Sequence, residues 1–235
     1  MAALQLRGVV KHYRGGGETV RAVDGVTLTI EAGEVVGLYG PSGSGKSTLL
    51  MLIAGLLAVD EGSIRFGGRE VTGFSARESA AYRRHDLGFV SQQFHLIPHA
   101  SALDNAMIGL GPLGLTAREA RAKTLPWLER VGLGTRVLHT SEELSMGERQ
   151  RVSIAAALVG EPGLLLADEP TGNLDSARSK EILALLRKIC REREIPGLLV
   201  THDAVAIDFV DRVITLRDGR LLDEAPPIQP ARKAP

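Results

Sequence analysis

The sequence predicts an α/β fold: a mostly parallel sheet, an antiparallel β subdomain at the N-terminus and an inserted α-helical subdomain. Short apolar runs alternate with helical patterns, and a strand–loop–helix unit opens near residue 35. A helical stretch at about 95–160 interrupts this alternation. The chain has 235 residues, 44% of them hydrophobic, which suffices for one large domain. We expect that domain to cover residues 1–224, followed by a proline-rich, disordered tail at 225–235.

Two apolar–polar alternations near the N-terminus, at residues 4–10 and 20–30, predict paired strands joined by the glycine-rich turn 14–17. Later strands are expected at residues 35–39, 63–66, 87–90, 164–167, 198–201 and 213–216, and helices at 46–57 and 176–194. Gly111-Pro112, Gly114 and residues 132–134 predict breaks in the helical stretch.

The bulk composition argues against a nucleic-acid-binding or membrane-spanning chain. The 28 basic and 28 acidic residues balance, so no nonspecific attraction to nucleic acid is indicated. The single cysteine, Cys190, lies in a helical pattern and suits a reducing compartment. The longest apolar run, residues 49–59, falls short of the about 20 residues that cross a bilayer. No signal peptide is expected at the N-terminus, so a membrane role requires a partner chain.

A phosphate-binding loop follows the strand predicted at residues 35–39. It reads Gly40-Pro41-Ser42-Gly43-Ser44-Gly45-Lys46-Ser47, with Thr48 next, and fits the pattern G-x-x-x-x-G-K-[ST] of a P-loop NTPase. The glycines let successive N–H groups point at one anion, at the start of the following helix. Lys46 adds a charge for the β- and γ-phosphates of ATP, and the Ser47 hydroxyl is a ligand for Mg²⁺.

A second apolar strand ends in two carboxylates, Asp168 and Glu169. A buried strand delivers acids where it emerges at the edge of the sheet. We expect Asp168 to hold Mg²⁺ directly or through water. Glu169 is expected to point to the other side of the strand end and to act as general base on the attacking water.

Four strings occur in the order GPSGSGKST, LSMGERQR, LADEPTGNLD and LVTHD. Together they resemble the ATP-binding subunits of ABC transporters over roughly residues 4–222. The run 167–175 is most similar to the lipoprotein-releasing and macrolide-exporter branch, which includes a cell-division member. The resemblance implies an ATPase that uses ATP and Mg²⁺ and dimerises around two ATP molecules.

The resemblance also implies roles for single residues. Tyr13 would stack on adenine, the alternative being a tyrosine packed in the core. Gln92 would sense Mg²⁺ and link to the membrane partner, although Gln93 is adjacent and competes for the role. Asp175 would pass signals between subunits. His202 would contact the γ-phosphate and orient the water.

The segment LSMGERQR resembles the family's signature. Ser145, Gly147 and Glu148 match this signature, whose serine hydroxyl and backbone N–H groups would bind the γ-phosphate of ATP held by the other subunit. Ser145 with Glu148 also fits a helix-capping box. Met146 departs from the family, which has glycine there. A methionine disfavours positive φ and is bulkier, so we expect weaker phosphate binding and slower hydrolysis.

Separate permease chains are the implied partners, and they would hold this subunit at the cytoplasmic face of the membrane. The segment 94–98 is a candidate lining of the permease groove, or internal packing. Two alternatives stay open at this point. The dimer is either a homodimer or a heterodimer, and the complex either transports a cargo or only transmits force. A soluble ATPase acting on DNA or ribosomes would need insertions and basic surfaces that the sequence lacks. A regulatory module without turnover conflicts with the intact Lys46, Asp168, Glu169 and His202.

Overall fold

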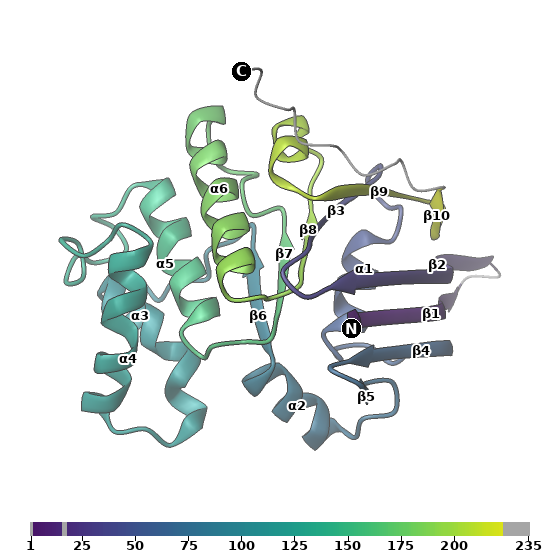
Figure 1. Ribbon diagram of the computed structural model, residues 1–235, viewed down its shortest axis with the longest axis horizontal. Coiled ribbons are helices and arrows are strands. Elements are labelled where there is room, and N and C mark those ends of the chain that lie inside the picture. The colour runs from purple at the N-terminus through teal and green to yellow at the C-terminus, as the bar shows by residue number, and fades with distance from the viewer. Residues whose placement is uncertain (1, 16–17, 223–235) are drawn as a thin grey trace.

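The computed structural model describes residues 2–15 and 18–222, which form two sheets and their flanking helices (Figure 1). Part of the predicted turn at 14–17 and the whole of the predicted tail at 225–235 lie outside the described residues. The helices α3, α4 and α5 and the antiparallel sheet lie at opposite ends of the molecule in Figure 1, with the larger sheet between them. The predicted fold class is confirmed.

The smaller sheet is antiparallel, with strand order β2-β1-β4-β5. Its strands are β1 (Ala2–Gly15), β2 (Glu18–Glu31), β4 (Glu61–Phe66) and β5 (Arg69–Glu70). Register shifts between β1 and β2 mark bulges, which let both strands run longer than the alternation predicts.

The larger sheet has the order β10-β9-β3-β8-β7-β6. Its strands are β3 (Val35–Tyr39), β6 (Leu87–Ser91), β7 (Leu164–Asp168), β8 (Gly197–Val200), β9 (Arg212–Arg217) and β10 (Arg220–Leu222). All neighbours pair in parallel except β9 and β10, which are antiparallel. Since the parallel strands share one direction, the carboxyl ends of β3, β7 and β8 meet at one edge.

The two faces of the larger sheet are covered differently. Val35 and Leu165 face a core shared with the helices, whereas Val36 and Leu164 face the core beneath the antiparallel sheet. Burial on both faces explains why these strands are apolar runs without polar alternation. Cys190 lies in the first core as a free thiol, and burial raises its pKa to about 12, so it stays protonated.

The helices are α1 (Lys46–Ile53), α2 (Ala76–His85), α3 (Ala102–Met107), α4 (Ala117–Arg130), α5 (Met146–Leu158) and α6 (Ser176–Glu192), with 3-10 segments η1 (Ile108–Leu113) and η2 (Ala204–Phe209). The predicted helix 46–57 ends early because Gly55 adopts φ 62° and Leu56 N–H bonds to Met51 O at 2.9 Å. The helix α2 was not predicted, although the sequence carries a signal for its start in the capping box formed by Ser75 and Glu78.

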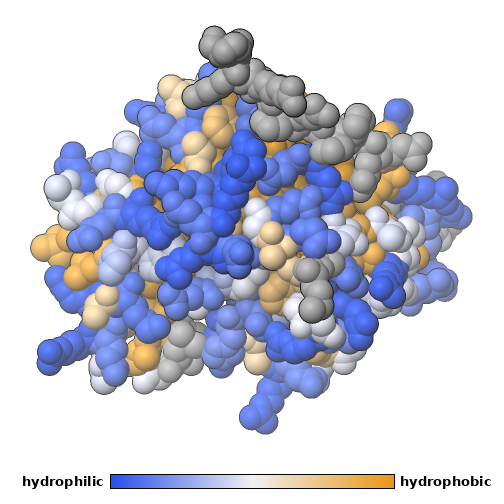
Figure 2. All heavy atoms as spheres, viewed as in Figure 1, coloured by the Kyte–Doolittle hydropathy of each residue, from blue (hydrophilic) through white to orange (hydrophobic). Residues whose placement is uncertain are grey.

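The outer surface is polar over the face shown in Figure 2, where hydrophobic residues form small, separate patches. Among the described residues, no helix is both long and apolar enough to cross a membrane.

Candidate functional site

The phosphate loop leaves β3 and enters α1 at the carboxyl edge of the larger sheet. Two of its glycines are required by close backbone approach: a Cβ would lie 2.1 Å from Leu216 O at Gly40 and 1.8 Å from Ala22 O at Gly45. Gly45 is the N-cap of α1, with φ 103° and no side-chain cap. The first N–H groups of α1 therefore keep their hydrogen-bonding capacity for an anion.

Lys46 folds back over the loop. Its Nζ donates to Gly40 O at 2.7 Å and to Pro41 O at 2.9 Å. It has no carboxylate ion-pair partner within the described part of the chain. A phosphate is a stronger partner for an ammonium group than a carbonyl, so this charge is available to a nucleotide.

Ser47 and Asp168 come together from α1 and the end of β7. The Ser47 hydroxyl donates to Asp168 Oδ2 at 3.3 Å. Burial raises the pKa of Asp168, and the hydrogen bond from Ser47 opposes the rise. A hydroxyl beside a carboxylate fits Mg²⁺, which takes oxygen ligands and usually keeps water and substrate phosphates in its shell. The described residues hold no cluster of three acidic, histidine or cysteine ligands.

We predict that Asp168→Asn raises the melting temperature of the nucleotide-free chain while abolishing Mg²⁺-dependent ATP turnover. A raised carboxyl pKa means that the folded chain disfavours the charged form, so at pH 7 the carboxylate costs stability, and stability rises as pH falls through that pKa. Removing the charge should therefore raise the melting temperature.

Asp24→Asn is the matched control, because a side-chain hydrogen bond from Arg220 holds the pKa of Asp24 below its usual range. This substitution should lower the melting temperature. Calorimetry of both variants checks the pair, and a lower melting temperature for Asp168→Asn would contradict the first expectation.

Glu169 and His202 meet where β7 and β8 end. His202 Nδ1 lies 2.7 Å from Glu169 Oε1, and Glu169 Oε2 is buried without a hydrogen-bond partner. Glu169 lies beyond β7 with φ 49°, so the turn, and not strand alternation, sets its direction. A carboxylate with one oxygen held by an imidazole and the other unpaired is poised to accept a proton.

A cavity of about 670 Å³ unites most of the predicted nucleotide-binding residues. Its lining includes Tyr13, Gly40, Ser42, Gly43, Gly45, Lys46, Ser47, Thr48, Asp168, Glu169 and His202. Pro41 and Ser44 belong to the loop but do not line the cavity.

Tyr13 is not a core residue, since its side chain is 42% exposed. It pairs across β1 and β2 with Val20, which is also exposed and lines the cavity. A directly opposed pair presents both side chains on one face of the sheet. Sequence reasoning missed Val20, whose signal is its apolar character opposite Tyr13 in the predicted hairpin. Together the two side chains form an apolar platform beside the phosphate cavity.

Gln92 does not line the phosphate cavity. It follows β6 and packs against the loop after β7: a Cβ at Gly172 would lie 2.8 Å from Gln92 Nε2, and Asn173 Nδ2 donates to Gln92 O at 2.9 Å. The choice between Gln92 and Gln93 as the sensing residue stays a prediction.

The segment around Ser145 lies in a different cavity, of about 230 Å³, with Ser145, Gly147, Glu148 and Arg178 in its lining. Both halves of the capping box are present: Ser145 Oγ accepts from Glu148 N at 3.3 Å, and Glu148 Oε2 accepts from Ser145 N at 2.8 Å. This cavity shares no residue with the phosphate cavity.

Met146 is the first residue of α5 and is 45% exposed. Its backbone is helical and its φ is negative. The prediction that methionine weakens phosphate binding because this position needs a positive φ is therefore wrong. Only the bulk of the side chain remains as a reason for weaker phosphate binding.

Asp175 is the N-cap of α6, where it accepts from Ala177 N at 3.1 Å and Arg178 N at 3.0 Å. The hydrogen bond from Arg178 N is the largest of the effects that hold the pKa of Asp175 below its usual range.

The comparisons with known proteins agree with this geometry. The family model described as "ABC transporter" matches residues 23–172. A lipoprotein-releasing system ATP-binding protein of Caulobacter vibrioides is 43% identical over 218 residues, 93% of this chain and 96% of that protein. A macrolide export ATP-binding/permease protein of Rhodopirellula baltica is 45% identical over 94% of this chain, which spans only 33% of that relative.

The solved structures point the same way. The dimeric post-hydrolysis state of the ATP-binding cassette MJ0796, bound to ADP and Pi, superposes with a TM-score of 0.85 and 37% identity. That match covers 94% of this chain and 97% of the other. The chain therefore belongs to the ABC transporter family, as an ATP-binding cassette subunit.

Proposed function

We propose that this chain hydrolyses ATP as a head-to-tail homodimer that drives separate membrane permease subunits. One observation carries the proposal: the phosphate cavity and the start of α5 are two anion-binding features with no residue in common. An ATP held at the phosphate loop of one subunit then meets Ser145 and Gly147 of a second subunit. Each dimer has two such sites, because a two-fold axis repeats every contact.

At each ATP site, the residues have separate roles in binding and hydrolysis. Lys46 and the N–H groups of α1 hold the β- and γ-phosphates, while Tyr13 and Val20 support the adenine. Ser47 and Asp168 would hold Mg²⁺, and the bound ion would supply positive charge against the charge that develops on the phosphates. Glu169 accepts a proton from the attacking water, and His202 keeps the carboxylate in place. ATP closes the dimer because it binds the closed arrangement more tightly than the open one.

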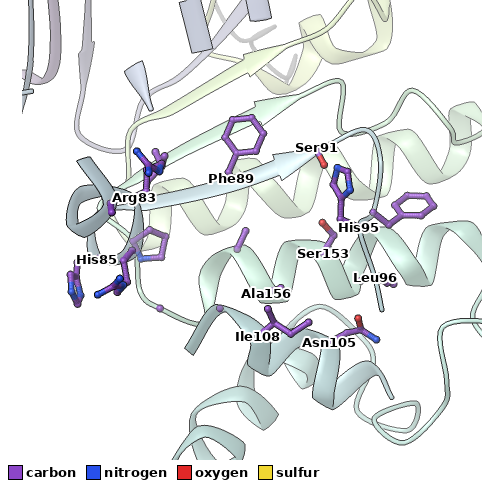
Figure 3. Close-up of a pocket in the computed structure, with 18 residues that line it drawn as sticks. Arg83, His85, Phe89, Ser91, His95, Leu96, Asn105, Ile108, Ser153 and Ala156 are labelled. Carbon is purple, nitrogen blue, oxygen red and sulfur yellow. The ribbon is translucent and has the colours of Figure 1, made fainter. Parts of the chain in front are cut away.

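Permease subunits are the proposed partners and would hold this chain at the cytoplasmic face of the membrane. The Caulobacter relative is named as the ATP-binding protein of a lipoprotein-releasing system and matches this chain over nearly its whole length. Part of the segment 94–98 faces an open cavity, since Phe94, His95 and Leu96 line it. Leu96 also packs against the core that the larger sheet shares with the helices, so the segment contributes both to internal packing and to the open cavity (Figure 3).

A mixed-subunit experiment tests the shared sites. Lys46→Ala disables the phosphate loop, and Ser145→Asp retains a capping residue while placing a negative charge against the incoming phosphate. Each variant alone should lose turnover. An equimolar mixture should recover up to roughly a quarter of the wild-type rate, because half of the dimers pair the two variants and restore one site. Phosphate release measures the recovery, and a mixture as inactive as its parts would overturn the homodimer.

We predict that Met146→Gly increases ATP turnover. Removing the exposed side chain lets the phosphate approach the first turn of α5 more closely, while the capping box is kept. Glycine lowers helix stability by up to about 1 kcal/mol, which a small drop in melting temperature would report. Steady-state phosphate release checks the rate. An unchanged rate and ATP affinity would show that the methionine does not limit hydrolysis.

A further inference from the structure

The turn between β9 and β10 packs directly against the phosphate loop. Gly219 N donates to Ser44 O of that loop at 3.2 Å. Asp218 and Gly219 both have a positive φ, of 50° and 78°, and form a two-residue hairpin turn. A Cβ at Gly219 would lie 2.4 Å from Arg21 O, so the turn also rests closely on β2, and Figure 1 shows β10 beside that strand. Gly219 does not line the phosphate cavity, so the turn supports the loop from outside the nucleotide site.

Asp24 of β2 binds this turn twice. Its N–H donates to Gly219 O at 2.8 Å, and its Oδ2 accepts from Arg220 Nε at 2.9 Å. We propose that Asp24 is a positioning residue for ATP: its carboxylate holds Arg220, and the turn that precedes Arg220 fixes the backbone of the phosphate loop at Ser44. The inference rests on the ATP site of the proposed function and not on the dimer.

The carboxylate of Asp24 is surrounded by basic groups. Besides Arg220, Arg21 NH1 lies 3.6 Å from Oδ2, and His12 Nε2 lies 3.1 Å from Oδ1. The side chain is only 14% exposed, so water competes weakly for these contacts. The hydrogen bond from Arg220 is the largest of the effects that hold the pKa of Asp24 below its usual range. The carboxylate is therefore charged at neutral pH, and Arg220 is its main partner.

The phosphate loop has little room to absorb a displacement of the strands around it. The backbone of β2 touches the loop at Gly45, where a Cβ would lie 1.8 Å from Ala22 O, and the backbone of β9 touches it at Gly40. The contact between Asp24 and Arg220 joins β2 to the hairpin that continues β9. Without this contact the two strands can separate, and the N–H groups of the loop lose the common direction that phosphate binding requires.

Equilibrium binding of ATP to the full chain tests the inference, at a temperature where circular dichroism shows every variant folded. Asp24→Asn should raise the dissociation constant of ATP roughly tenfold, because the charge-assisted hydrogen bond to Arg220 is lost. Arg220→Gln removes the same contact from its exposed partner and should give a similar rise. The double substitution should be no worse than either alone, since both act through one contact. Affinity for inorganic tripolyphosphate, which can occupy the phosphate loop alone, should fall by the same factor.

Glu34→Gln is the matched control. Glu34 is likewise a half-buried carboxylate and accepts from Arg212 Nε at 2.5 Å. It precedes β3, whereas the phosphate loop follows the other end of that strand. This variant should lose stability and still bind ATP as the unmodified chain does. In steady-state hydrolysis, Asp24→Asn should raise the KM for ATP and leave kcat nearly unchanged, because Glu169 and His202 follow other strands.

Four results would overturn the inference. These are unchanged ATP affinity in Asp24→Asn, an equal loss of affinity in Glu34→Gln, losses that add in the double variant, or a loss for ATP without one for tripolyphosphate. A lower kcat with an unchanged KM would also contradict a role in binding. The binding measurements keep the two proposals apart: a chain that shows the expected affinity changes but hydrolyses no ATP would refute the ATPase cycle and not the role of Asp24.

Discussion

Replacement of Glu169 by glutamine is expected to lower ATP turnover by at least about a hundredfold while ATP still binds. Glutamine has nearly the same shape but cannot accept a proton from water. His202 Nδ1 lies 2.7 Å from Glu169 Oε1, and Glu169 Oε2 is buried with no hydrogen-bond partner among the described residues. Phosphate release measures turnover, and equilibrium binding of labelled ATP measures affinity.

The Glu169→Gln variant also tests whether the chain forms a dimer with itself. If hydrolysis opens the closed dimer, Glu169→Gln with ATP and Mg²⁺ should remain dimeric in analytical ultracentrifugation. Glu129→Gln, an exposed substitution on α4, is the control and should behave as the unmodified chain. Unchanged turnover in Glu169→Gln would remove Glu169 as the base. Loss of turnover without self-association would favour a heterodimer with another ATPase subunit.

Replacement of Gly45 by alanine is expected to destroy the phosphate loop. The new Cβ would lie 1.8 Å from Ala22 O, and the φ of 103° is one that alanine rarely adopts. Left-handed strain of about 1–2 kcal/mol and overpacking of about 1–3 kcal/mol add to a loss of roughly 2–5 kcal/mol in the free energy of unfolding. The loop would shift to relieve the contact, and nucleotide binding would be lost with it.

Gly43 provides the matched control within the same loop. Its φ is 79°, yet a Cβ there would meet nothing within 4 Å. Gly43→Ala should therefore cost only the strain of about 1–2 kcal/mol. Chemical denaturation and ATP binding of both variants test the difference. An equal loss of stability and ATP binding in the two variants would mean that the positive φ alone, and not the contact with Ala22, determines whether the loop tolerates a side chain.

The features that could be predicted from the sequence are those that depend on residues close together in the chain. The phosphate loop and the acids after β7 are contiguous, and each sits at the end of an apolar run that predicts a buried strand. Parallel strands bring their carboxyl ends together, so the meeting of Lys46, Ser47, Asp168 and Glu169 follows from the pattern alone. The capping box at Ser145 is equally local, because it needs only two residues three positions apart.

Other features depend on contacts between distant segments. The helix α2 buries only Tyr82, so its apolar pattern is too weak to reveal it. The position of Gln92 depends on packing against Gly172, which no local signal encodes. The direction of Glu169 follows from a left-handed turn, and the helical φ of Met146 follows from the cap at Ser145.

The sequence by itself determined which chemistry to expect of this protein: it predicts which residues bind phosphate, which bind Mg²⁺ and which segment completes the site. Those assignments need only residue type, spacing and strand ends. Only the tertiary structure decided that Tyr13 and Val20 form one platform and that the Ser145 segment lies apart from the phosphate cavity. Each of these depends on the pairing and packing of segments far apart in the chain, and that information resides in contacts and not in local spacing.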